Sequence, residues 1–198
     1  MLLIVEDDAA LAGYLRSILS AQGHEVRVAH DAATAQPVIA GTTPPGIGVL
    51  DLGLPPSPSS IREGIALLEE WLRRVPGAKI IVLTGQDDET SAQEAIRCGA
   101  FDFLVKPVEM PAVLQAVARA ALFNDHEGRM SAQGETRIQF TARLADGPRE
   151  VAAAAEEQLV RKTLAETDHN VAQTARRLGL VRENVYYYLK KYGIRRPD

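Results

Sequence analysis

The chain has 198 residues, of which 46% are hydrophobic and 24% are charged, and its formal net charge at pH 7 is −4. These values are ordinary for globular proteins and exclude a largely disordered chain. No apolar run is long enough to cross a bilayer, the first residues lack the basic region of a signal peptide, and a single cysteine excludes an intramolecular disulfide. We therefore expect a soluble, cytoplasmic protein without membrane contacts.

The charge is distributed unevenly along the chain. Residues 1–123 carry 9 basic and 15 acidic side chains, whereas residues 149–198 carry 10 basic and 7 acidic side chains. Residues 176–198 alone have 7 basic and 2 acidic groups. An acidic first half followed by a basic end favours two modules, of which the second is suited to nucleic acid.

Short apolar runs alternate with helix-like segments through the first half. The strand-like runs are Leu2–Val5, Glu25–Ala29, Ile47–Leu50, Lys79–Leu83 and Phe101–Val105. The segments with helical periodicity are Ala9–Ala21, Asp31–Ala40, Gly64–Arg74, Thr90–Cys98 and Pro111–Phe123. This alternation predicts right-handed crossovers, and continuously apolar strands are typical of a sheet covered on both faces. We expect an α/β fold with a five-stranded, doubly wound parallel sheet over residues 1–123.

The second half has a different pattern. Residues 124–148 are polar, contain scattered glycines and show little periodicity, so we predict a linker, in which the alternating residues 137–141 are a candidate short strand. Helices are expected at Glu150–Thr167, Val171–Leu178 and Arg182–Tyr192, with Gly179 ending the second of them. Residues 149–198 are therefore predicted to form a small all-α helix-turn-helix domain.

Polar residues follow four of the predicted strands. Glu6 and Asp7 follow the first strand, Asp51 the third, Thr84 the fourth and Lys106 the fifth. Ligands of such sheets bind at the carboxyl ends of the strands, where three carboxylates would repel one another and attract Mg²⁺. A carboxylate beside this ion can accept a phosphoryl group as an acyl phosphate. Lys106 supplies the counter-charge and Thr84 a hydrogen-bond donor.

Four sequence strings carry a family resemblance. They are Ile4-Val5-Glu6-Asp7-Asp8, Asp51-Leu52-Gly53-Leu54-Pro55, Leu83-Thr84-Gly85 and residues 99–107, Gly-Ala-Phe-Asp-Phe-Leu-Val-Lys-Pro. Together they resemble the receiver domain of bacterial two-component response regulators, which has a CheY-like fold. The resemblance implies that a sensor histidine kinase phosphorylates Asp51. It also implies that Mg²⁺ is held by Glu6, Asp7, Asp51 and the carbonyl group of Gly53.

The same resemblance assigns further roles. Thr84 and Lys106 would assist the phosphoacceptor, Thr84 and Phe103 would form the switch, and the Lys106–Pro107 peptide bond would be cis. Two features depart from the family pattern. Phe103 stands where tyrosine is commoner, and the loop that follows Asp51, residues 56–63, is longer than usual and rich in proline and serine.

The basic end has the layout of a helix-turn-helix. The residues expected to pack its two helices together are Val171, Ala175, Leu178, Val185 and Leu189. The second helix would enter the major groove, where Arg182 is suited to guanine and Asn184 to adenine. The side chains expected to contact the DNA backbone are Arg176, Arg177, Tyr186, Lys190, Lys191, Arg195 and Arg196.

Residues 156–164, 174–180 and 188–194 resemble the Fis-type helix-turn-helix at the carboxyl end of NtrC-class regulators. The resemblance implies a homodimer on a pseudo-palindromic operator, with the helix at 150–167 in the dimer interface. The run Tyr186-Tyr187-Tyr188 departs from the family, in which this stretch is usually basic or mixed. No Gly-x-x-x-x-Gly-Lys-Ser/Thr motif is present, so the layout is closer to short receiver-plus-Fis regulators that lack the central ATPase domain.

The sequence therefore predicts a non-enzymatic, DNA-binding transcriptional response regulator. One alternative is a phosphorylation-dependent adaptor whose carboxyl-terminal helices only dimerise or bind a protein partner. Another is a phosphatase or other hydrolase that uses the acid cluster, although the sequence offers no second catalytic base for it. Salt-dependent binding to DNA would distinguish the regulator from the adaptor.

Overall fold

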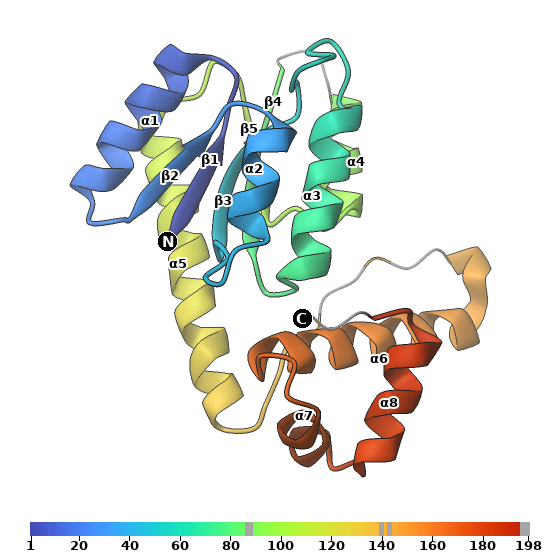
Figure 1. The fold of residues 1–198 in the computed structure, drawn as a ribbon. Coiled ribbons are helices and arrows are strands. Elements are labelled where there is room, and N and C mark those ends of the chain that lie inside the picture. The colour runs from blue at the N-terminus through green and yellow to red at the C-terminus, as the bar shows by residue number, and fades with distance from the viewer. Residues whose placement is uncertain (86–88, 139–140, 142–143, 195–198) are drawn as a thin grey trace. The chain divides into compact units, whose positions relative to one another are not determined.

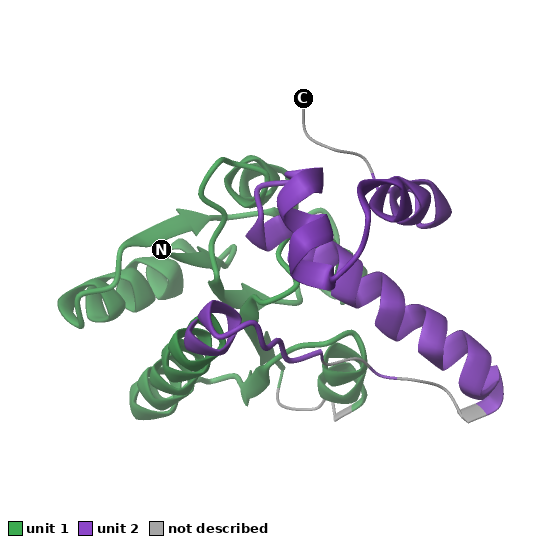
Figure 2. Cartoon of the chain, turned by 90° about the horizontal axis from the view of Figure 1, so that it is seen from below, with its two compact units in different colours: residues 1–128 green, residues 129–198 purple. Residues whose placement is uncertain are grey.

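The computed structural model describes residues 1–85, 89–138, 141 and 144–194 (Figure 1). The chain divides into two compact units, Met1–Gly128 and Arg129–Asp198 (Figure 2). The boundary falls within helix α5, which spans Met110–Ala132. In the described part of the chain, no helix is both long enough and apolar enough to span a membrane.

The first unit contains the predicted five-stranded sheet. Its strands are β1 (Leu2–Val5), β2 (Val26–Ala29), β3 (Ile47–Asp51), β4 (Lys79–Thr84) and β5 (Asp102–Val105). The order in the sheet is β2-β1-β3-β4-β5, and all four neighbouring pairs are parallel. Every strand agrees with its predicted range to within one residue at each end, which confirms the predicted fold class.

Helices cover both faces of this sheet (Figure 1). The helices are α1 (Ala9–Ala21), α2 (Ala32–Ile39), α3 (Arg62–Arg74), α4 (Glu89–Arg97) and α5. Because successive strand residues point to opposite faces, Leu3 of β1 packs with Trp71 of α3 in one core, and Ile4 packs with Leu15 of α1 in the other. The first core joins α2, α3 and α4 to the sheet, and the second joins α1 and α5.

The prediction that the helix after β5 ends at Phe123 was wrong. Helix α5 continues to Ala132, through the first part of the predicted linker. Polar contacts hold this extension: Asn124 donates a hydrogen bond of 2.9 Å to the carbonyl of Gly46, and Lys79 Nζ lies 2.9 Å from the Glu127 carboxylate. Apolar periodicity gives no sign of such contacts. Residues 139–140 of the candidate strand at 137–141 lie outside the described residues.

The second unit is helical, as predicted. A 3₁₀ turn at Leu144–Asp146 precedes α6 (Gly147–Glu166), α7 (Val171–Leu178) and α8 (Arg182–Lys191). These three helices share a separate hydrophobic core, whose buried members are Val160, Leu164, Val171, Ala175 and Val185. The packing predicted for Val171, Ala175 and Val185 is thereby confirmed.

Candidate functional site

The acid cluster forms at the carboxyl ends of β1 and β3, which are neighbours in the sheet. Carboxylate oxygens of Glu6, Asp7 and Asp51 lie within 4.8 Å of one another. Glu6 and Asp51 are buried, with exposed fractions of 0% and 7%, whereas Asp7 is exposed. Sheet topology therefore brings together three carboxylates from distant parts of the chain, and one of them remains open to solvent.

Lys106, from the segment after β5, enters this cluster. Its Nζ lies 2.8 Å from Asp51 Oδ2 and 2.8 Å from Glu6 Oε2. Burial raises the pKa of Glu6 to about 7, and the Asp51 carboxylate adds to this effect. Desolvation lowers the pKa of Lys106, but its hydrogen bonds to Asp51 and Glu6 outweigh that effect and raise it. One ammonium therefore faces three carboxyl groups, which leaves an excess of negative charge.

Thr84 and Gly53 complete the surroundings of Asp51. Thr84 ends β4 and is 2% exposed, and its hydroxyl has no hydrogen-bond partner among the residues that the structure describes. The Gly53 N–H donates a bond of 3.1 Å to Asp51 Oδ1. A Cβ on Gly53 would lie 2.7 Å from the carbonyl oxygen of Pro58, so the long loop packs where only glycine fits.

Phe103 lies on β5, and Pro107 lies in the segment that follows β5. The Lys106–Pro107 peptide bond is cis, as expected. Phe103 is 40% exposed on β5, and its backbone pairs in register with Val82 of β4, two residues before Thr84. The aromatic ring therefore lies at the surface of the sheet edge.

Sequence reasoning missed one residue beside the cluster. His30 Nδ1 lies 2.9 Å from the carbonyl oxygen of Glu6. Because a carbonyl only accepts hydrogen bonds, Nδ1 carries the proton and donates. The available clue was position, since His30 directly follows β2, the neighbour of β1 in the sheet. Asp8, next to the acid pair, is the N-cap of α1 and accepts hydrogen bonds from the N–H groups of Ala10 and Leu11.

Local sequence signals define both helices of the helix-turn-helix. The Asn170 side chain caps α7 by accepting a bond of 3.1 Å from the Gln173 N–H. Gly179 ends α7 with a φ of 65°, a left-handed conformation that favours glycine. A hydrogen bond of 2.7 Å joins the buried hydroxyl groups of Thr167 and Thr174 between α6 and α7. The sharp turn and the shared core leave one side of α8 at the surface.

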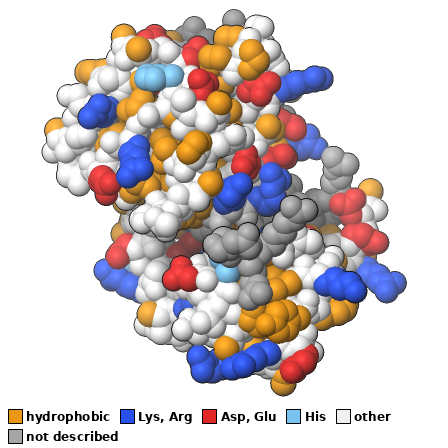
Figure 3. All heavy atoms as spheres, viewed as in Figure 1, with side chains coloured by type: hydrophobic (Ala, Val, Ile, Leu, Met, Phe, Trp, Pro, Cys, Tyr) orange, Lys and Arg blue, Asp and Glu red, His pale blue; other side chains and the backbone are white. Residues whose placement is uncertain are grey.

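The residues predicted to contact DNA are mostly exposed. Tyr186 is 52% exposed, and Arg176, Arg177, Arg182, Asn184, Lys190 and Lys191 are also exposed. Lys and Arg side chains and a hydrophobic patch are both visible on the second unit in Figure 3. Arg195 and Arg196 lie outside the described residues.

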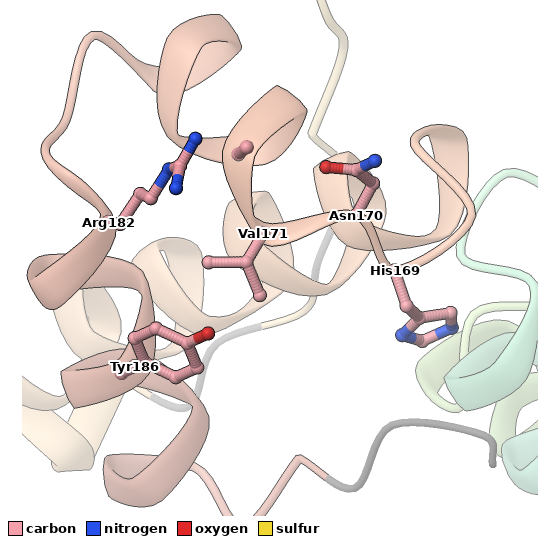
Figure 4. Close-up of a pocket in the computed structure, with 6 residues that line it drawn as sticks. His169, Asn170, Val171, Arg182 and Tyr186 are labelled. Atoms are coloured by element: carbon pink, nitrogen blue, oxygen red, sulfur yellow. The ribbon is translucent and has the colours of Figure 1, made fainter.

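Arg182 and Tyr186 also line a cavity of about 340 Å³ (Figure 4). The other residues that line it are His169, Asn170, Val171 and Ala172, at the start of α7. Arg182 and Tyr186 are four residues apart and lie on the same face of α8. The two predicted DNA contacts are therefore brought together beside the amino-terminal end of α7.

Comparisons with known proteins match both units. Residues 2–118 match the model of the response regulator receiver domain, and residues 152–192 match that of the Fis family of bacterial regulatory proteins. The chain is 29% identical over 192 residues to the photosynthetic apparatus regulatory protein RegA of Rhodovulum sulfidophilum, covering 96% of this chain and 91% of RegA. It is also 29% identical over 192 residues to the acid tolerance regulatory protein ActR of Rhizobium meliloti, covering 96% of this chain and 86% of ActR.

Solved structures agree with these matches. The receiver domain of NtrX from Brucella abortus is 33% identical, with a TM-score of 0.55, and the match covers 61% of this chain and 97% of that domain. A response regulator from Burkholderia pseudomallei, solved with a phosphorylated aspartic acid and a calcium ion, is 25% identical, with a TM-score of 0.53. That match covers 93% of this chain and 95% of the other.

The two family matches also explain the short layout. Only residues 119–151 separate them, too few for a central ATPase domain. The receiver match alone spans more than half of the chain, and RegA and ActR align with it over nearly its whole length. The chain belongs to the response regulator receiver family and, with its Fis-type helix-turn-helix, is a DNA-binding transcriptional response regulator.

Proposed function

We propose that a sensor histidine kinase controls this regulator by phosphorylating Asp51. The observation that carries the proposal is the convergence of the Glu6, Asp7 and Asp51 oxygens within 4.8 Å, with Lys106 Nζ 2.8 Å from Asp51. The phosphorylated aspartic acid of the related Burkholderia pseudomallei regulator supports it. The proposed receiver domain comprises residues 1–123 and the DNA-binding domain residues 149–198. Residues 124–148 connect the two, and the first part of this segment is the end of α5.

The proposed reaction is a single phosphoryl transfer. A carboxylate oxygen of Asp51 attacks the phosphorus of a phosphohistidine, and the new O–P bond forms as the P–N bond breaks. The imidazole nitrogen keeps the electron pair of the broken bond. Lys106 pairs with the added negative charge, and the Thr84 hydroxyl donates a hydrogen bond to a phosphoryl oxygen.

The residues of the cluster fit a divalent cation. Three carboxyl groups face one ammonium, and the oxygen donors from Glu6, Asp7, Asp51 and the Gly53 carbonyl are those that Mg²⁺ prefers. When bound, Mg²⁺ would neutralise negative charge on the carboxylates and on the incoming phosphoryl group. In its absence, repulsion between the cluster and the phosphate donor would oppose the transfer.

The output side of the proposal concerns DNA. The Thr84 hydroxyl, which has no hydrogen-bond partner among the described residues, turns toward the phosphoryl group, and Phe103 leaves its exposed position on β5. The resulting change in the receiver surface alters the association of two chains on a pseudo-palindromic operator in the cytoplasm. Arg182 and Asn184 read bases, and exposed basic side chains of α7 and α8, together with Tyr186, give the second unit a surface that attracts the DNA backbone.

Labelling with radioactive acetyl phosphate tests the phosphoacceptor. We expect wild type to take up at most one phosphoryl group per chain in the presence of Mg²⁺, and none when the ion is chelated. Asp51→Asn should take up no label, whereas Asp8→Asn is a matched control, since asparagine also caps helices and Asp8 lies outside the proposed machinery. Undiminished label on Asp51→Asn would refute the assignment, and release of phosphate from acetyl phosphate that persists in Asp51→Asn would indicate a hydrolase instead.

A further inference from the structure

Two pairs of adjacent basic residues stand out in the helix-turn-helix. Arg176 and Arg177 lie in the last turn of α7, and Lys190 and Lys191 lie in the last turn of α8. All four are at least partly exposed and would be equivalent phosphate contacts by charge alone. Within each pair, however, the two neighbours have very different surroundings.

Lys191 is tied to α6. Its ammonium forms a short ion pair with Glu156, and Glu156 also accepts a hydrogen bond from the Tyr192 hydroxyl. Lys191 Nζ lies 4.8 Å from the centroid of the Tyr192 ring, 5.7 Å from that of Tyr188 and 5.9 Å from that of Tyr187. Carboxylate and ring faces both stabilise a cation, so Lys191 joins α8 to α6.

Arg177 is held in a similar way. One of its guanidinium nitrogens lies 3.1 Å from Glu166 at the end of α6. The other donates to both the carbonyl and the hydroxyl oxygen of Ser131, at 2.8 and 2.7 Å. The Ser131 hydroxyl in turn donates a bond of 2.8 Å to Glu166. Arg177 therefore completes a closed polar network among residues of the second unit.

Arg176 and Lys190 have no such partners. In the part of the chain that the structure describes, neither side chain forms an ion pair or a hydrogen bond with another residue. The two neighbours of each pair point in different directions around their helix, since consecutive residues do not share a helix face. Each pair thus contains one basic residue held by an acidic residue of α6 and one that faces solvent.

We propose that Arg176 and Lys190 bind DNA phosphates, whereas Arg177 and Lys191 are positioning residues that orient α7 and α8 against α6. This inference rests on the proposed DNA binding of α7 and α8. For Lys191 to reach a phosphate, Glu156 would lose its partner beside an anionic backbone, and the same holds for Arg177 and Glu166. Like-charge repulsion would oppose such an exchange.

The salt dependence of DNA binding separates the two roles. The logarithm of the association constant falls linearly with the logarithm of the salt concentration. Each phosphate that the protein neutralises makes this slope steeper by about 0.9, because binding releases condensed counterions. We would measure binding of the full chain to a labelled duplex of mixed sequence, between about 50 and 200 mM salt. Arg176→Gln and Lys190→Gln should each flatten the slope by about 0.9 for every phosphate that the variant no longer neutralises. Arg177→Gln and Lys191→Gln should weaken binding with an unchanged slope.

A double variant with the two charges exchanged distinguishes loss of the ion pair from poor folding of a single variant. Combining Lys191→Glu with Glu156→Lys preserves the net charge and restores an ion pair between α6 and α8 with reversed polarity. If Lys191 is a positioning residue, the double variant should recover the affinity that Lys191→Gln lacks, and so should Lys191→Arg. Circular dichroism would verify that every variant retains its helices.

An unchanged slope for Arg176→Gln or Lys190→Gln would overturn the assignment of that residue as a phosphate contact. A flatter slope for Lys191→Gln or Arg177→Gln, equal to that of its neighbour, would overturn the positioning role. Failure of the charge exchange to recover affinity, in a folded variant, would do the same. If wild type binds the duplex without salt dependence, or not at all, the proposed DNA-binding function fails instead.

Discussion

The pKa of Glu6 gives a quantitative prediction for the acid cluster. Burial raises this pKa from 4.5 to about 7, so the carboxyl group is largely protonated at about pH 6 and largely ionised at about pH 8. A cation binds the ionised form, and protons therefore compete with Mg²⁺ below the raised pKa. With a pKa of about 7, the ionised fraction changes about tenfold between these two pH values, and we expect Mg²⁺ affinity to fall about tenfold as the pH is lowered.

Isothermal titration calorimetry of the full chain with MgCl₂ at the two pH values measures this effect. Glu6→Gln removes the titrating group, so it should bind Mg²⁺ more weakly but with little dependence on pH. His30 Nδ1 contacts the carbonyl oxygen of Glu6, and His30→Asn serves as a control for that contact. Equal affinities at both pH values in wild type, or an undiminished pH effect in Glu6→Gln, would refute the reasoning.

Three further predictions concern stability and reactivity. Gly48→Ala would place a Cβ 2.5 Å from the ring of buried Trp71, so urea denaturation should show that the free energy of unfolding falls by about 1–3 kcal/mol. Gly13→Ala is the control: there is open space around this position, so the free energy of unfolding should not fall. Burial raises the pKa of Cys98 from 9.0 to about 11, so iodoacetamide should alkylate it about a hundredfold more slowly at pH 8 than an ordinary thiol. Asn170→Ala should destabilise the second unit by about 1 kcal/mol in thermal unfolding, because α7 loses its cap; unchanged unfolding would contradict that role.

Sequence pattern predicted most of the first unit because apolar runs and helical periodicity report burial. The extension of α5 was not predictable in this way. Its contacts, Asn124 with Gly46 and Lys79 with Glu127, join residues 48 to 78 positions apart and are polar. A stretch held by such contacts looks like a linker in sequence, since hydrophobic periodicity is the signal that a helix normally gives.

The acid cluster was predictable for a different reason. Parallel strands place their carboxyl ends at one edge, so Glu6, Asp51 and Lys106 were expected together before any distance was known. The partners of the basic residues in the helix-turn-helix were not expected. Glu156 lies 35 positions before Lys191, and an acidic residue on α6 looks like any solvated charge until the packing of the helices is known.

The buried hydroxyl of Thr84 lowers the stability of the unmodified protein but provides a hydrogen-bond donor for the proposed phosphoryl group. This hydroxyl has no hydrogen-bond partner within the described part of the chain, and a buried polar atom left without one costs about 1–3 kcal/mol, whereas valine has the same shape and no such group. Thr84→Val should therefore leave the unmodified protein equally or more resistant to urea while depriving it of the donor that a phosphoryl oxygen would meet. Threonine at this position should therefore keep the unmodified protein slightly less stable than valine would, and the proposed phosphoryl group on Asp51 would supply a hydrogen-bond acceptor for its hydroxyl.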